Sequence, residues 1–222
     1  MNILRMIRPP DLLTLLNIAF GFSALLAAAR YSQIPPQAAV VFILLAAMAD
    51  GLDGFLARRL GSGPLGASLD SLADLVSFGA APAFLALQTF DPSPQAWLLG
   101  IIYLVCGTLR LARFDTSQKS DQFFEGLPIP AAGIALSASV LLDRSGLTLL
   151  IMLALSLAMV SSISFPKIRD MMAFSLLGLV LLGAGSLIWL GIETVYAALL
   201  LLIIIMIYLA SPVVISCPRK GR

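Results

Sequence analysis

Four aspartates are the residues of this chain with the clearest capacity for chemistry. They form two pairs with helical spacing, Asp50 with Asp53 and Asp70 with Asp74. Residues three or four positions apart lie on the same face of an α-helix, so each pair presents two carboxylates in one direction. Carboxylate oxygens are ligands for Mg²⁺, Mn²⁺ and Ca²⁺, and the absence of His and Cys from this stretch disfavours zinc. The pattern predicts a site for divalent cations.

The two pairs lie at the facing ends of two apolar stretches, residues 38–49 and 75–87. Three glycines and a proline at residues 61–66, between the pairs, break helices, so we expect two helices joined by a short loop, with the acids near a membrane surface. Acids at helix ends are usually solvated, which is the simpler interpretation. However, a carboxylate at the centre of a membrane helix costs about 2.5–3.5 kcal/mol on insertion scales, and like charges one turn apart repel. Four acids in this arrangement therefore favour bound cations.

The composition is that of a membrane protein. Of 222 residues, 59% are hydrophobic and 12% are charged, and the mean hydropathy is +0.99. Apolar stretches near the length of a bilayer crossing predict an all-α polytopic membrane helix bundle with about eight transmembrane helices, at residues 12–30, 36–57, 66–89, 95–113, 127–142, 146–164, 171–190 and 192–212. The loops are short, so residues 1–222 are predicted to form a single domain.

The N-terminal residues and the basic residues predict how the chain sits in the membrane. Residues 1–10 could form a short interfacial helix ended by Pro9 and Pro10; with the first span they also resemble a signal peptide, which we expect to be retained. With a cytoplasmic N-terminus, all 14 Lys and Arg residues except Arg30 and Arg144 fall on the cytoplasmic side. We therefore expect both termini and the four acids at the cytoplasmic face of the cell membrane. The chain has no basic patch for nucleic acid, and the positions of Cys106 and Cys217 predict no disulfide framework.

The stretch from Asp50 to Asp74 resembles the signature of the CDP-alcohol phosphotransferases. It has the form D-x2-D-G-x2-A-R, a spacer, then G-x3-D-x3-D, with a spacer of seven residues where the family usually has eight. Two divalent ions, Mg²⁺ or Mn²⁺, shared by the four acids would neutralise the diphosphate of a CDP-linked lipid. The acceptor hydroxyl needs a base, and because the chain has no His, a carboxylate is the natural candidate. The resemblance points to Asp74 for this role.

The resemblance also implies the residues that contact the CDP-linked lipid. They are the small and basic signature positions and two polar positions of the first span: Gly54, Ala57, Arg58, Gly66, Thr14 and Asn17. Hydrogen bonding between helices is an equal alternative for Thr14 and Asn17, and helix packing is an alternative for Gly54 and Ala57. Similar proteins are dimers, so a homodimer in membrane lipid is expected.

Three further segments resemble the serine-transferring branch of this family. They are residues 69–83, RLARF (110–114) and EGLPIP (125–130), although Asp115 stands where the branch often has Asn. This resemblance implies transfer of a phosphatidyl or archaetidyl group from a CDP-linked lipid to the hydroxyl of L-serine, with release of CMP. It covers roughly residues 10–135, with the branch-specific loop at 110–130. The last three spans are predicted from hydropathy alone.

Arg110 and Arg113 share one helix face at the end of the fourth span. They could be topological anchors with snorkelling side chains, or they could bind an anion, since arginine pairs bidentately with carboxylates and phosphates. We expect them to hold the serine carboxylate, with Asp115 or Glu125 near the ammonium. One alternative is another acceptor, glycerol 3-phosphate or an inositol phosphate. The other is a divalent-cation transporter, which would not need the signature glycines and arginine.

Overall fold

The computed structural model describes residues 6–29, 34–61, 63–90, 93–116, 123–166, 171–190 and 194–214. Its helices are α1 (Pro9–Ala28), α2 (Gln37–Leu60), α3 (Gly66–Asp74), the π-helix η2 (Leu75–Ala80), α4 (Ala81–Thr89), α5 (Pro94–Thr116), α6 (Ile129–Val140), α7 (Ser145–Val160), α8 (Met171–Trp189) and α9 (Thr194–Val214). Two short strands, β1 (Phe123–Glu125) and β2 (Ser164–Pro166), pair in antiparallel orientation.

The predicted all-α membrane helix bundle is confirmed. Because α3, η2 and α4 follow one another without a break, the helices correspond to the eight predicted stretches. Four segments are long and apolar enough to cross a membrane, and the other apolar helices are shorter within the described residues. Many large apolar side chains are exposed, among them Leu12, Trp97 and Leu150. Such a surface suits contact with lipid, where backbone groups must be satisfied inside helices. The single-domain assignment stays a prediction.

The structure differs from the predicted boundaries by a few residues at several helix ends, and two of these differences have a clear physical cause. Pro9 and Pro10 open α1 instead of ending an earlier helix, because the fixed φ of proline suits the first helical turn. The Arg8 backbone N–H donates to Asp11 Oδ2 at 2.7 Å and completes this start. Residues 1–5 lie outside the described residues, so the interfacial helix stays a prediction. At the other place, α7 ends at Val160 instead of residue 164, because the backbone turns extended at Ser161 (φ −61°, ψ 161°) and residues 164–166 pair as β2.

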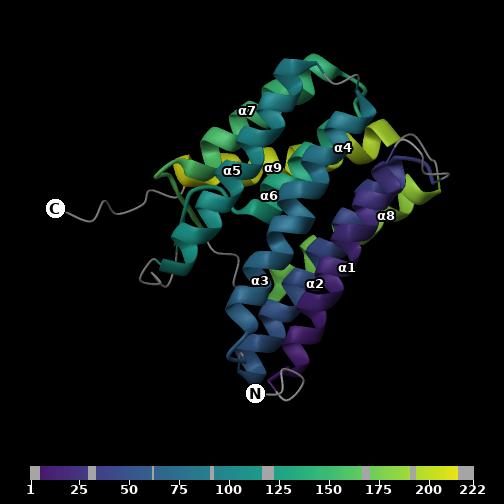
Figure 1. Ribbon diagram of the computed structural model, residues 1–222. Helices are drawn as coiled ribbons and strands as arrows, with labels where there is room; N and C mark the ends of the chain where they lie inside the picture. Colours follow the sequence, from purple (N-terminus) through teal and green to yellow (C-terminus); the bar gives the residue numbers. More distant parts are fainter. Residues whose placement is uncertain are drawn as a thin grey trace.

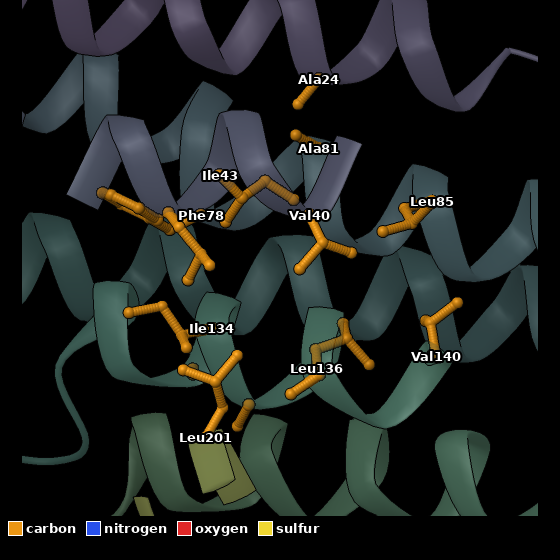
Figure 2. Packing of buried hydrophobic residues seen from close by; sticks show 14 of the residues in the cluster. Ala24, Val40, Ile43, Phe78, Ala81, Leu85, Ile134, Leu136, Val140 and Leu201 are labelled. Atoms are coloured by element: carbon orange, nitrogen blue, oxygen red, sulfur yellow. The ribbon is translucent and has the colours of Figure 1, made fainter. Parts of the chain in front are cut away.

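The helices pack around a central α6. In Figure 1, α1, α2 and α3 lie side by side next to the N-terminus, and α5 lies along α7. Helix α6 contacts α2, η2, α4, α7 and α9. Figure 2 shows the core at this junction, where Ile43 of α2 and Phe78 of η2 lie above Leu136 of α6 and Leu201 of α9. This core fixes the helices that carry the four acids relative to the C-terminal helices.

The π-helix η2 begins directly after Asp74. Pro82 has no N–H, so the carbonyl of Phe78, four residues earlier, loses its usual helical donor. The Tyr103 hydroxyl of α5 donates to that carbonyl at 3.0 Å instead. On the opposite side, α1 approaches so closely that a Cβ at Gly21 would collide with the Ser77 side chain. Contacts with α1 and α5 therefore fix η2 and the end of α3. Short π segments of this kind often occur at functional sites.

Candidate active site

Three of the four acids come together in space. Asp50 of α2 and Asp70 and Asp74 of α3 each offer a carboxylate oxygen, and these three atoms lie within 4.8 Å of one another. The loop between the helices turns the chain back (Figure 1), with Gly61 at φ +81° and its N–H donated to the Ala57 carbonyl at 2.9 Å. Glycine adopts this left-handed conformation at no steric cost. The signature spacing thus brings carboxylates from two helices to one point.

Asp53 lies beside this group but is not a member of it. Its Oδ2 accepts a hydrogen bond from the Thr14 hydroxyl of α1 at 2.6 Å, and its side chain is 6% exposed. Its carboxylate remains close enough to Asp70 for an electrostatic interaction. Thr14, which was expected to contact the CDP-linked lipid, therefore donates a hydrogen bond to Asp53.

Asn17 of α1 contacts Asp74 in the same way. Its Nδ2 donates to Asp74 Oδ1 at 3.3 Å, and Ser77 Oγ of η2 donates to the Asn17 backbone carbonyl at 3.0 Å. The Asn17 side chain is fully buried, and its Oδ1 has no hydrogen-bond partner among the described residues. A buried acceptor without a donor costs free energy. An unpaired oxygen next to three clustered carboxylates fits a site whose electrostatics are completed by a divalent cation, which prefers such ligands.

A cavity of about 340 Å³ opens beside the acid group. Asp50, Asp70 and Asp74 form one part of its wall, and Arg110, Phe114 and Tyr208 form another. The remaining wall is small or apolar: Ala47, Gly51, Pro128, Pro130, Ala131, Ile134, Leu181, Ile204 and Ile205. Arg110 is 6% exposed, and its guanidinium carbon lies 5.4 Å from the centroid of the Phe114 ring. An acidic part, a cationic part and apolar walls suit an amphipathic substrate with an anionic group.

The other signature positions lie on the same two helices but outside this cavity wall. Gly54 and Ala57 follow the first acids on α2, Arg58 is exposed in the last turn of α2, and Gly66 opens α3. A Cβ at Gly54 would meet only the Arg58 guanidinium, at 3.8 Å. The absence of a side chain at Gly54 therefore leaves space next to the Arg58 guanidinium.

The structure separates the two arginines predicted to act together. Arg110 lines the cavity, whereas Arg113 donates hydrogen bonds to backbone carbonyls. The acceptors are the carbonyls of Val160 at 3.3 Å, Glu125 at 2.8 Å, Met159 at 3.2 Å and Ser161 at 3.1 Å. The last carbonyls of a helix have no backbone N–H donor within the helix, and the Arg113 guanidinium donates to those at the end of α7 instead. Arg113 thus joins the end of α7 to the EGLPIP segment.

Gly126 makes that junction sterically possible. It has φ +79°, and a Cβ there would collide with the Met159 carbonyl and the Arg113 guanidinium. Its backbone N–H donates to the Ile163 carbonyl at 2.8 Å, and the Leu127 N–H donates to the Ala158 carbonyl at 3.1 Å. The segment that supplies Pro128 and Pro130 to the cavity is held by its backbone.

Little in the sequence marks the part of the cavity wall that α8 and α9 contribute. Leu181, Ile204 and Ile205 are ordinary residues of apolar spans, and the one available signal is the polar hydroxyl of Tyr208 within such a span. Glu125 is exposed, and the structure assigns its side chain no role. The Asp115 side chain and residues 117–122 of the predicted branch-specific loop lie outside what the structure describes.

The profile of the CDP-alcohol phosphatidyltransferases matches residues 8–181, which include the four acids and Arg110. The chain belongs to this family. Membership confirms the resemblance carried by the signature and, with the four long apolar helices, identifies an integral membrane enzyme. The match ends within α8, so the part of the cavity wall that α9 contributes lies beyond it.

Similar proteins include enzymes from archaea and bacteria. An archaetidylserine synthase of Methanothermobacter thermautotrophicus is 38% identical over 168 residues, which are 73% of this chain and 71% of the relative. A CDP-diacylglycerol–serine O-phosphatidyltransferase of Methanocaldococcus jannaschii is 38% identical over 75% of this chain and 77% of its own. The enzyme of the same name from Bacillus subtilis is 36% identical over 72% of this chain and 90% of its own.

Proposed function

We propose that the protein transfers a phosphatidyl or archaetidyl group from a CDP-linked lipid to the hydroxyl of L-serine and releases CMP. The observation that carries this proposal is that one and the same cavity is lined by the clustered carboxylates of Asp50, Asp70 and Asp74 and by the buried Arg110. The acids would bind the cations that an enzyme needs to cleave a diphosphate, and the arginine would bind the carboxylate of an amino acid. The names of the three relatives support serine as the acceptor.

The four acids would hold two divalent ions, Mg²⁺ or Mn²⁺. The side chains of this group offer oxygen donors, which fits these hard cations. When bound, the ions would neutralise the negative charge of the diphosphate and of its developing leaving group. Asp53 would join the three clustered carboxylates from its position beside Thr14. Space at Gly54 and Ala57 and the charge of Arg58 would accept the nucleotide and its phosphates, with Gly66 opening the second helix of the site.

Asp74 would act as the base. In the transfer, the serine oxygen forms a bond to the lipid-linked phosphorus, the bond from that phosphorus to the CMP oxygen breaks, and the serine hydroxyl proton moves to a carboxylate. Asp74 lines the cavity, and the Asn17 amide fixes one of its oxygens. Asn17 and Thr14 would thus orient acids, and contact with the CDP-linked lipid stays a further prediction for both.

Arg110 would hold the serine carboxylate, and Arg113 would position the neighbouring segment. Both arginines were predicted as serine ligands. The hydrogen bonds of Arg113 to four carbonyls give it a structural role, because they hold residues 125–130 against the end of α7. We propose that Arg113 acts on serine binding through this support of the cavity wall.

We expect Arg110→Ala to raise the KM for serine by roughly 10- to 150-fold, because a hydrogen bond to a charged group at a desolvated site is worth about 1.5–3 kcal/mol. The KM for the CDP-linked lipid should change much less. Arg144→Ala is the matched control, since it removes an exposed arginine at the turn between α6 and α7. Steady-state kinetics with each substrate varied in turn measures both constants. A normal serine KM in Arg110→Ala would show that the carboxylate is bound elsewhere.

We propose the cell membrane as the location, with the acids and both termini at the cytoplasmic face. Among the described basic residues, Arg8, Arg58 and Arg113 lie at helix ends on the side of the acids, and Arg144 lies at the opposite turn. That distribution agrees with the excess of positive charge found in cytoplasmic loops. We also propose a homodimer, as expected from the resemblance.

The proposed function is tested by CMP release with a CDP-linked lipid and a panel of acceptors. The expected result is turnover with L-serine and little with glycerol 3-phosphate or an inositol phosphate. Preference for glycerol 3-phosphate would refute serine as the acceptor and leave the acid site unaffected. No CMP release with any acceptor, together with divalent-cation flux through vesicles, would favour the transporter.

A further inference from the structure

Tyr208 lies in the cavity wall with Arg110 but comes from the last helix. It belongs to α9, beyond the residues 8–181 that match the family profile. Its neighbours in sequence are apolar, namely Ile203, Ile204, Ile205, Met206, Ile207 and Leu209. The phenol of Tyr208 is thus the polar side chain of residues 203–209. It lines a cavity that also contains charged residues, and a buried phenol hydroxyl usually takes part in a hydrogen bond.

The ring of Tyr208 is held in place by aromatic stacking. Phe165 of β2 stacks on it, with 5.7 Å between ring centroids and 25° between ring planes. Phe165 is 2% exposed and pairs through its backbone with Phe124 of β1. The two short strands, which sequence analysis did not predict, therefore fix the direction of the tyrosine ring at the cavity.

The Tyr208 phenol and the Arg110 guanidinium are close enough to interact electrostatically. Arg110 interacts in the same way with Asp74 and Asp50. Arg110, Tyr208 and these two acids all line the same cavity. A carboxylate bound there beside both Arg110 and Tyr208 would accept N–H and O–H donors together.

We propose that Tyr208 is a specificity-determining residue for the acceptor, whose carboxylate accepts a hydrogen bond from the Tyr208 hydroxyl beside Arg110. The inference rests on the proposed function in one respect, because it takes an amino acid as the acceptor. A phosphate of the CDP-linked lipid has related anionic chemistry, and the experiment below separates the two anions. An acceptor without a carboxylate would gain nothing from this hydroxyl.

The test uses Tyr208→Phe in the full-length protein reconstituted with lipid. This substitution keeps the ring and its stacking on Phe165 and removes the hydroxyl alone. We expect the KM for serine to rise roughly 10-fold or more, with little change in kcat or in the KM for the CDP-linked lipid. Inhibition of the serine reaction by ethanolamine, which has a hydrogen atom in place of the carboxylate and therefore no acceptor there, should be the same in both proteins. Tyr196→Phe, at a 67% exposed tyrosine of the same helix, is the control.

The other outcomes overturn the proposal in distinguishable ways. An unchanged serine KM with a raised KM for the CDP-linked lipid would assign the hydroxyl to a lipid phosphate. Equal weakening of serine and ethanolamine, or a matching loss of thermal stability, would give Tyr208 a structural role only. Failure of the wild-type protein to use serine would remove the proposed function itself, whereas a normal serine KM in Tyr208→Phe would remove this inference alone.

Discussion

Asp70→Asn is expected to lose divalent-cation affinity and turnover together, each by at least about 100-fold. Losing even an outer partner of a metal ligand typically costs 10- to 100-fold, and this substitution removes a charged ligand. Asp70 belongs to the three-oxygen group and shares the cavity with Asp50 and Asp74, so an amide there removes negative charge where the cations would bind. Mn²⁺ binding to the substrate-free protein, measured by electron paramagnetic resonance, reports affinity independently of catalysis. CMP release during a Mg²⁺ or Mn²⁺ titration reports turnover.

Asp143→Asn is the matched control for this experiment. Asp143 is an exposed acid at the turn between α6 and α7 with φ +52°, a conformation that asparagine also adopts. The variant removes one carboxylate outside the acid group and should keep normal cation affinity. In the wild-type protein, a strong chelator should abolish activity and added Mg²⁺ or Mn²⁺ should restore it. Full activity without divalent ions, or unchanged Mn²⁺ affinity in Asp70→Asn, would contradict a cation site at these acids.

The spacing of the acids predicted their helices and most of their geometry, but not the separate position of Asp53. Three residues advance an α-helix by about 300°, which leaves Asp53 about 60° away from the direction of Asp50. This difference in direction separates Asp53 from the other acids because α1 packs beside it, where the Thr14 hydroxyl donates a hydrogen bond to Asp53. The polar positions Thr14 and Asn17 were recognised in the sequence. Their contacts with particular acids depend on how α1 packs.

Hydropathy predicted the helices because the bilayer imposes a length on every apolar span. It could not predict η2, because the acceptor freed by Pro82 is satisfied by Tyr103 from a different helix. The two strands were missed for a similar reason. Each has three residues, and the pairing of Phe124 with Phe165 joins segments far apart in the chain. The part of the cavity wall that α9 contributes could not be predicted for the same reason, since Tyr208 comes to the cavity of Arg110 only through the packing of α9.

Asp74→Asn is expected to reduce turnover by roughly 10²- to 10⁴-fold while binding of the CDP-linked lipid largely survives. General-base assistance typically contributes this factor, and asparagine cannot accept the proton of the serine hydroxyl. Asparagine has nearly the same shape, so the variant should keep its place beside Asn17, whose amide contacts Oδ1 of the native residue. Single-turnover CMP release at saturating serine measures the chemical step, and equilibrium binding of the labelled CDP-linked lipid measures affinity.

Comparison of Asp74→Asn with Asp70→Asn separates a base from a ligand. Both acids belong to the three-oxygen group and both line the cavity, so a purely ligating role would give the two variants the same loss of Mn²⁺ affinity and of turnover. A base predicts a larger loss in the chemical step than in Mn²⁺ affinity for Asp74→Asn alone. Asn17→Ala should show the same imbalance to a smaller degree, since it removes the donor that orients Asp74 but leaves the carboxylate in place. If CDP-lipid binding falls in Asp74→Asn as far as turnover does, Asp74 acts mainly as a ligand, and the base must be another carboxylate of the cavity.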